Sequence, residues 1–204
     1  MKEKIIYGLK WFYQSYIWLF IVLLGLDILT KQLVMHAGVE PGNMIADWGF
    51  VHISYVLNPN AAFGLGANNP VVSRIIYLVV ASLVSIGIIA YLIIKRSTVK
   101  GYVRACLVLI VTGALGNLID RIFYSTTNYC VVDWIDFYWF WSYNFNIADS
   151  CIVVSAFMLI IYIIISEVKE VMEKRKAENA PAKILSKSEK ERLEEENADN
   201  DNSK

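Results

Sequence analysis

The sequence predicts an all-α polytopic membrane protein with four transmembrane helices and short strands on the outer side of the membrane. Hydrophobic residues make up 56% of its 204 residues and mean hydropathy is +0.45, more than the core of a soluble domain this size requires. Four segments reach the roughly 20 mostly apolar residues that cross a bilayer. Residues 1–166 contain only eight acidic residues, whereas residues 167–204 contain eleven.

The four predicted spans are residues 12–34, 71–94, 103–123 and 146–166. The second has no charge between Arg74 and Lys95 and is predicted to be a plain anchor. The other three each carry polar residues near one end. Ionisable residues inside a membrane are costly and indicate pairing or function.

Basic residues predict the orientation. They gather in MKEKIIYGLK before the first span, KRSTVKGYVR before the third and EVKEVMEKRK after the fourth, which the positive-inside rule places in the cytoplasm. Both termini are then cytoplasmic, and residues 35–70 and 124–145 lie outside. Four tryptophans of these outer loops are expected at headgroup level: Trp48, Trp134, Trp139 and Trp141. The alternating stretch FVHISYVLNPN predicts strands and turns there.

Two regions are predicted, a transmembrane domain over residues 1–166 and a charged, partly disordered cytoplasmic tail over residues 167–204, rich in charge and poor in apolar residues. The first span is expected to be retained, because Asp27 and Lys31 interrupt its apolar run and no small-x-small cleavage site follows.

Common metal and nucleotide motifs do not appear in the sequence. The three cysteines, Cys106, Cys130 and Cys151, show no CxxC spacing, and His36 and His52 have no third ligand nearby. HExxH, GxSxG and P-loop patterns are missing as well. We therefore expect no metal, no cofactor and no nucleic-acid partner.

Polar residues of the first and third spans are spaced to share helix faces. Asp27 and Lys31 stand four apart and can pair. Asn117 lies three and four residues before Asp120 and Arg121, and small residues just before it permit close helix approach. A structural role is the simpler interpretation of both groups.

The fourth span opens with FNIADS, in which Asn146 can cap the helix. Asp149 gains only ~0.3 to 1 kcal/mol from the helix dipole, less than the roughly 2.5 to 3.5 kcal/mol that a charge costs at a helix centre in the membrane. It needs a cation or a proton shared with another acid, for which Asp133 or Asp136 of the outer loop is available. Two close carboxylates share one proton and can perform acid and base catalysis together.

Five motifs, DILTK, YVLNPNAAFG, GALGNLIDR, VVDWIDF and FNIADS, occur in this order, and over residues 12–166 the chain resembles the bacterial lipoprotein signal peptidases, the type II signal peptidases. The resemblance implies an aspartic endopeptidase of the bacterial plasma membrane with a small outer β-sheet on four helices. It implies lipid-modified prolipoproteins as substrates, cut before the diacylglyceryl-modified cysteine. Membrane lipid is the other expected partner, and a monomer is expected.

The resemblance assigns the catalytic aspartates to Asp133 and Asp149, and so prefers Asp133 over Asp136. The supporting polar residues that it implies are Asp27, Lys31, Asn58, Asn117, Asp120, Arg121 and Asn146. The chain departs from the family's pattern in two places: Asn60 stands where glycine is usual, and the connection over residues 121–132 is a few residues longer.

Two alternatives belong to other classes: a small transporter or channel component, and an inactive scaffold that binds lipoproteins. A transport route needs polar residues through the membrane depth, whereas here they cluster near one surface. The pair of aspartates disfavours an inactive scaffold.

Overall fold

The structure is a computed structural model that describes residues 2–59, 69–139 and 141–178. The chain divides into two compact units, Met1–Ile161 and Tyr162–Lys204. The boundary falls inside the last helix, so the predicted start of a separate tail at residue 167 stays a prediction.

The fold is mostly helical, as predicted. Its helices are α1 (Lys2–Ser15), α2 (Ile17–Met35), α3 (Pro70–Ile94), α4 (Gly101–Phe123) and α5 (Ile147–Glu178). Among the described residues, four segments are long and apolar enough to cross a membrane: Ile17–Met35, Pro70–Ile94, Gly101–Phe123 and Ile147–Ala177. The four predicted spans are confirmed, with shifted ends.

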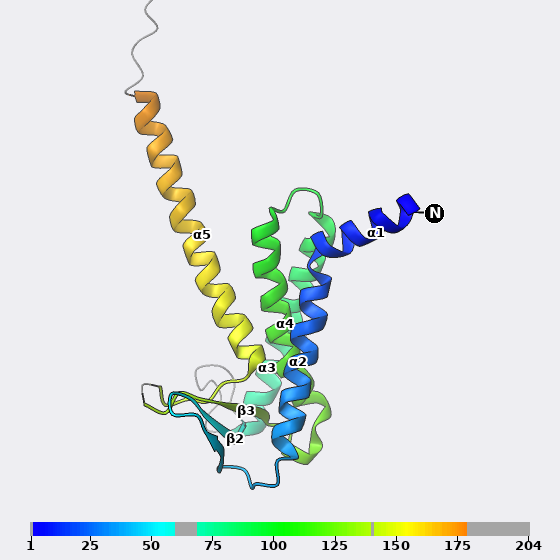
Figure 1. Cartoon of the computed structure of the whole chain (residues 1–204), viewed down its shortest axis with the longest axis vertical. Coiled ribbons are helices and arrows are strands. Elements are labelled where there is room, and N and C mark those ends of the chain that lie inside the picture. Colours follow the sequence, from blue (N-terminus) through cyan, green and yellow to red (C-terminus); the bar gives the residue numbers. More distant parts are fainter. Residues whose placement is uncertain (1, 60–68, 140, 179–204) are drawn as a thin grey trace, which may run out of the picture. The chain divides into compact units, whose positions relative to one another are not determined.

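The largest shift is at the first span, where the predicted start at residue 12 is wrong. Tyr16 adopts a left-handed conformation with φ 60° and separates α1 from α2. Arg104 of α4 fixes this break by donating to the backbone oxygen of Gln14 at 2.9 Å. Figure 1 shows α1 leaving the line of α2 at this point.

A three-stranded antiparallel sheet lies at one end of α2 and α4 (Figure 1). It contains β1 (Met44–Asp47), β2 (His52–Asn58) and β3 (Val131–Asp136), paired in the order β1-β2-β3. The strands predicted in residues 35–70 are thus confirmed. Buried Val34 of α2, Tyr55 of β2 and Val132 of β3 form the core that joins the sheet to the helices.

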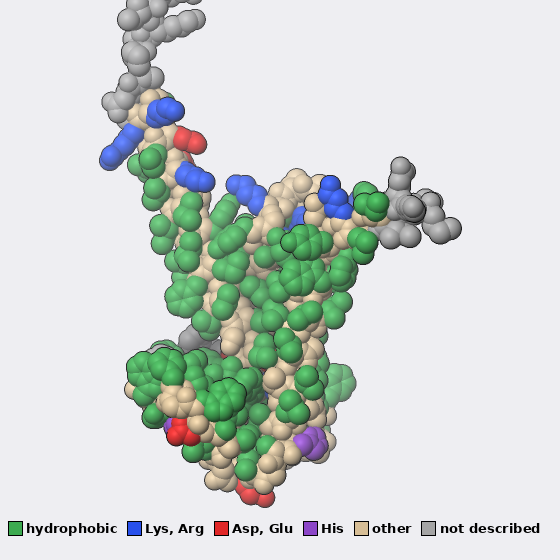
Figure 2. All heavy atoms as spheres, in the orientation of Figure 1, with side chains coloured by type: hydrophobic (Ala, Val, Ile, Leu, Met, Phe, Trp, Pro, Cys, Tyr) green, Lys and Arg blue, Asp and Glu red, His purple; other side chains and the backbone are tan. Residues whose placement is uncertain are grey.

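The helix α4 is the most buried of the four spans, with 61% of an 18-residue apolar stretch buried inside the fold. Gly113 and Gly116 let α5 approach it closely: a Cβ on Gly116 would lie 2.8 Å from both the Ala148 Cβ and the Asp27 Oδ2. The outer faces of α2 and α3 carry exposed apolar side chains, and Figure 2 shows those of α2. This surface suits contact with lipid chains.

The two ends of the helical fold differ in their exposed basic residues. Lysine and arginine gather at the end where α1 and the α3–α4 connection lie (Figure 2). At the opposite end, α2 and α4 finish and α3 and α5 begin, beside the sheet. The predicted polar residues of all these elements therefore meet at one end of the fold.

Candidate active site

Asp133 lies in β3, opposite Val56 of β2. Because side chains alternate along a strand, Val132 enters the core while Asp133 points to the other face. The Asp133 side chain is almost fully buried, and each carboxylate oxygen accepts a hydrogen bond: Oδ1 from Asn146 Nδ2 at 2.7 Å and Oδ2 from Asn58 Nδ2 at 2.9 Å. Burial, reinforced by the nearby charge of Asp149, raises the pKa of Asp133 to about 7.

Asp149 lies in the first turn of α5, which Asn146 caps as predicted. The Asn146 Oδ1 accepts from the Asp149 backbone N–H at 2.9 Å, and the Asn146 N–H donates back to Asp149 Oδ2 at 3.3 Å. This reciprocal pair satisfies free groups at the helix start. The other carboxylate oxygen of Asp149 accepts from Asn117 Nδ2 at 2.7 Å.

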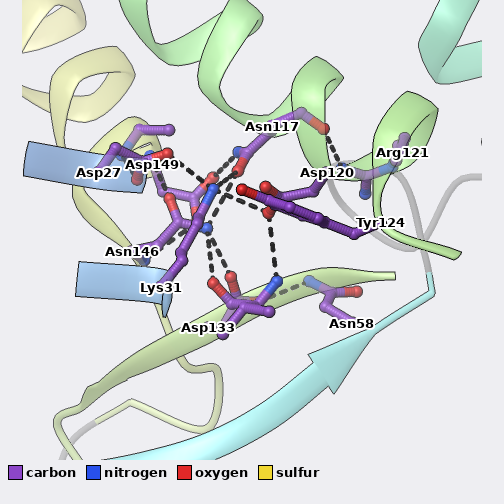
Figure 3. Close-up of polar contacts among 12 residues, drawn as sticks. Asp27, Lys31, Asn58, Asn117, Asp120, Arg121, Tyr124, Asp133, Asn146 and Asp149 are labelled. Carbon is purple, nitrogen blue, oxygen red and sulfur yellow. Dashed lines mark hydrogen bonds and ion pairs between the residues drawn. The ribbon is translucent and has the colours of Figure 1, made fainter. Parts of the chain in front are cut away.

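Two side-chain amides connect the two carboxylates (Figure 3). Asn146 Nδ2 contacts both Asp133 Oδ1, at 2.7 Å, and Asn117 Oδ1, at 3.0 Å. Asn117 Nδ2 in turn contacts Asp149. One strand and two helices thus hold Asp133 and Asp149 through a continuous path of hydrogen bonds.

Lys31 anchors this path from α2. Its ammonium is fully buried and lies 2.8 Å from Asp27 Oδ2, 2.9 Å from Asp120 Oδ2 and 3.1 Å from Asn117 Oδ1. An ammonium can only donate, so it orients the Asn117 amide with its oxygen toward Lys31 and its nitrogen toward Asp149. The predicted pair of Asp27 and Lys31 is confirmed as part of a larger ion cluster.

The two acids of the cluster also bind backbone amides of the elements that carry the aspartates. Asp27 Oδ1 accepts from the Ala148 N–H at 2.9 Å, at the start of α5. Asp120 Oδ2 accepts from the Val132 N–H at 3.3 Å, next to Asp133. The cluster therefore positions the backbone on either side of the carboxylate pair.

The prediction that the second span is a plain anchor is wrong. The ring of Tyr77 in α3 lies beneath the Arg121 guanidinium, 4.1 Å from centroid to Cζ, and Arg74 Nε donates to the Arg121 backbone oxygen at 2.8 Å. Arg121 Nη1 reaches the Asn117 backbone oxygen at 3.3 Å. The signal was in the sequence, since Arg74 and Tyr77 stand three apart and share a helix face.

Asp136 lies outside this network. It is half-buried in β3 and accepts from Ser54 Oγ at 3.3 Å. Of the predicted residues, those in the network are Asp27, Lys31, Asn58, Asn117, Asp120, Arg121, Asp133, Asn146 and Asp149, all labelled in Figure 3. Asn60 lies outside the described residues.

The arrangement suits proton transfer at a water molecule. Two carboxylates that share a buried site cannot both ionise readily, so over a range of pH one keeps a proton while the other is a base. The amides hold both groups in fixed orientation, as acid and base catalysis requires.

Comparisons with known proteins find relatives over most of the chain. The family model described as "Signal peptidase (SPase) II" matches residues 19–165. A protein named "Lipoprotein signal peptidase" from Clostridioides difficile (strain 630) is 39% identical over 154 residues, covering 76% of this chain and 97% of the relative. A protein of the same name from Haemophilus influenzae (strain ATCC 51907 / DSM 11121 / KW20 / Rd) is 32% identical over 165 residues, covering 79% and 92%.

Two solved structures, each described as a bacterial membrane enzyme, share the fold. One has a TM-score of 0.59 at 22% identity and covers 82% of this chain and 93% of its own. The other has a TM-score of 0.57 at 24% identity and covers 72% and 90%.

Proposed function

The chain belongs to the signal peptidase II family of aspartic peptidases, and from this premise we propose that Asp133 and Asp149 are the catalytic pair with which it removes signal peptides from prolipoproteins. The observation that carries the proposal is the path of hydrogen bonds from Asp133 through Asn146 and Asn117 to Asp149. The bond cut is the one before the diacylglyceryl-modified cysteine.

The pair acts on a water molecule and on the carbonyl of the bond to be cut. The ionised carboxylate takes a proton from water as the water oxygen attacks the carbonyl carbon, and the protonated carboxyl donates to the carbonyl oxygen. When the resulting intermediate collapses, the carbon–nitrogen bond breaks and the new amine takes a proton from the pair. The raised pKa of Asp133 supports this, because it keeps one proton on the pair near neutral pH.

The surrounding polar residues position the pair and do not react. Asn58 and Asn146 hold Asp133, and Asn117 holds Asp149. Lys31 orients Asn117, while Asp27 and Asp120 neutralise the Lys31 charge. We assign Arg121 a supporting role through its bond to the Asn117 backbone oxygen.

The same proposal includes an orientation in the bacterial plasma membrane. Both termini are cytoplasmic and the carboxylate pair is near the outer surface, which is supported by the lysine and arginine at the opposite end of the helices. A diacylglyceryl-modified substrate then arrives laterally within the membrane. Its acyl chains favour membrane retention by about 0.8 kcal/mol per buried CH₂, so few sequence requirements are expected away from the modified cysteine.

We also propose that one chain is sufficient for catalysis. Both carboxylates and the residues that hold them come from a single chain. No residue of a second copy is needed to complete the path of hydrogen bonds.

The test is cleavage of a diacylglyceryl-modified prolipoprotein by purified protein in detergent with excess chelator. Asp133→Asn and Asp149→Asn should each abolish cleavage without preventing folding, because asparagine has almost the same shape and cannot exchange a proton. Asp136→Asn is the matched control and should keep activity, since Asp136 contacts Ser54 outside the network. Cleavage retained by either active-site variant, or a folded wild type that binds the substrate without cutting it, would refute the proposal.

A further inference from the structure

Arg74 is a half-buried cation for which the described residues supply no counter-charge. It lies in the first turns of α3, where its Nε donates to the Arg121 backbone oxygen and its Cζ lies 3.6 Å from the centroid of the Tyr129 ring. Within the described part of the chain no carboxylate pairs with it, and neither Nη atom donates a hydrogen bond to a described residue. The guanidinium is therefore held in place by α4 and by the Tyr129 ring, while its Nη donors find no acceptor among the residues that the structure describes.

That edge borders a pocket of about 440 Å³ between the start of α3 and the turn that precedes β3. Asn128, Tyr129 and Cys130 line the pocket on the turn side, and Pro59 and Val71 line it elsewhere. A pocket of this size holds more than a few waters. It is distinct from the network around Asp133 and Asp149, none of whose residues lines it.

The turn keeps Tyr129 in an unusual backbone conformation. Asn128 and Tyr129 have φ 53° and 60°, a left-handed region that asparagine tolerates and a bulky residue rarely adopts. Thr127 Oγ1 bonds the backbone oxygens of Tyr124 and Cys130, at 3.0 and 3.1 Å, and stabilises the turn. In this conformation the Tyr129 ring lies under the Arg74 guanidinium, and strained backbone of this kind occurs preferentially at functional sites.

The charge and depth of the pocket indicate the ligand. The guanidinium suits a phosphate, with which it can form two parallel hydrogen bonds. Pro70 begins an apolar span, so the pocket lies at the depth of lipid headgroups. Below it, Val71, Val72 and Ile75 are 65%, 45% and 54% exposed and offer an apolar surface to acyl chains.

We propose that this pocket binds the phosphate group of an anionic phospholipid. Arg74 is the principal residue that binds the phosphate, and the acyl chains of the lipid lie against the exposed apolar face of α3. Free inorganic phosphate could use the guanidinium but not the apolar face. The proposal does not depend on the catalytic assignment, because Arg74 contacts neither aspartate.

Cys130 provides a direct measurement, since it lines the pocket, whereas Cys106 and Cys151 are buried. The rate at which a maleimide labels Cys130 is measured by mass spectrometry for the full chain in nanodiscs of phosphatidylglycerol and in nanodiscs of phosphatidylcholine. A bound anionic lipid should slow labelling about tenfold in phosphatidylglycerol relative to phosphatidylcholine. Phosphatidylglycerol also makes the membrane surface negative, which changes the labelling rate without any bound lipid. In Arg74→Gln the difference between the two lipids should shrink to this effect of surface charge alone.

Arg104→Gln is the matched control, because Arg104 lies at the other end of α4 and should leave the ratio unchanged. Inorganic phosphate added to protein in neutral detergent should not protect Cys130, and equal protection there would assign the site to free phosphate. Native mass spectrometry of the wild type should retain phosphatidylglycerol over phosphatidylcholine, which tests the site even if Arg74→Gln fails to fold. Equal ratios in wild type and Arg74→Gln, or no lipid preference in the native spectra, would overturn the proposal.

Discussion

Asn146 donates a 2.7 Å hydrogen bond to Asp133 from the same side chain whose oxygen caps the helix that carries Asp149. One residue thus sets the position of both carboxylates relative to each other. The cap and the amide donor are separable by mutation, because serine caps helices well but has no amide group.

Asn146→Ser should lower the cleavage rate about 100-fold, because the cap persists but Asp133 loses a donor that orients it. Asn146→Ala should lose the same activity and in addition about 0.5 to 2 kcal/mol of stability with the cap. Cleavage assays and thermal unfolding of both variants check this. Asn43→Ala is the control, because it removes a side-chain amide that donates to the Glu40 backbone oxygen in an exposed loop. Normal activity in Asn146→Ser would show that the amide is not needed.

Lys31→Met should destabilise the fold by about 3 to 5 kcal/mol, because it leaves Asp27 and Asp120 buried without their cation. It should also reduce cleavage, since Asn117 loses the group that orients its amide. Unfolding temperature and activity are measured together. Lys174→Met is the control, because Lys174 forms an exposed ion pair with Glu170, and such surface pairs contribute little to stability. A Lys31→Met protein as stable as the control would contradict the role of the ion cluster.

Gly116→Ala should separate α4 from α5 and reduce stability by about 1 to 3 kcal/mol, the usual effect of overpacking. The added methyl group would meet the Ala148 Cβ and Asp27 Oδ2, each at 2.8 Å. Activity should fall with stability, because Ala148 precedes Asp149. Gly87→Ala in α3 has nothing within 4 Å of the new Cβ and should be neutral or slightly stabilising. Equal melting temperatures for the two variants would contradict the close approach.

Cleavage should decline as pH rises through the apparent pKa of the pair, because the active form holds one proton and that proton is lost. Burial and the charge of Asp149 raise the pKa of Asp133 to about 7, so the decline should lie far above the ordinary range of an aspartate. Asn58 stabilises the ionised form through its bond to Asp133, so Asn58→Ala should move the decline to higher pH.

The profile of kcat/KM against pH checks both statements. Ser54→Ala removes a comparable bond from the same strand to Asp136 and should leave the profile unmoved. A shift with Ser54→Ala but not with Asn58→Ala would assign the titrating acid to Asp136.

Much of the fold follows from the sequence because the membrane imposes simple constraints. Long apolar runs predict the four spans, and the alternation of apolar and polar residues in FVHISYVLNPN predicts strands. The break at Tyr16 was missed because its cause lies outside the local sequence: Arg104 of α4 binds the Gln14 backbone oxygen there. Helix ends set by contacts with distant elements leave no periodic signal.

The site was predictable where residues repeat at helical spacing and otherwise only in part. Asp27 and Lys31 pair as their spacing predicts, but the third member, Asp120, comes from another helix. The choice of Asp133 over Asp136 came from resemblance, since spacing alone left both open. The roles of Tyr77 and Arg74 are missed because an apolar span with so few charges predicts a plain anchor, although α3 packs against α4 and contacts Arg121.

The most direct test of the central claim, that Asp133 and Asp149 activate water without a covalent intermediate, is a single turnover in H₂¹⁸O with enzyme in excess over prolipoprotein. The released signal peptide should carry one ¹⁸O in its new carboxyl group, and peptides containing Asp133 or Asp149 should carry none. An unlabelled first product together with ¹⁸O in either aspartate would show that the carboxylate itself attacks the peptide, and would contradict the account.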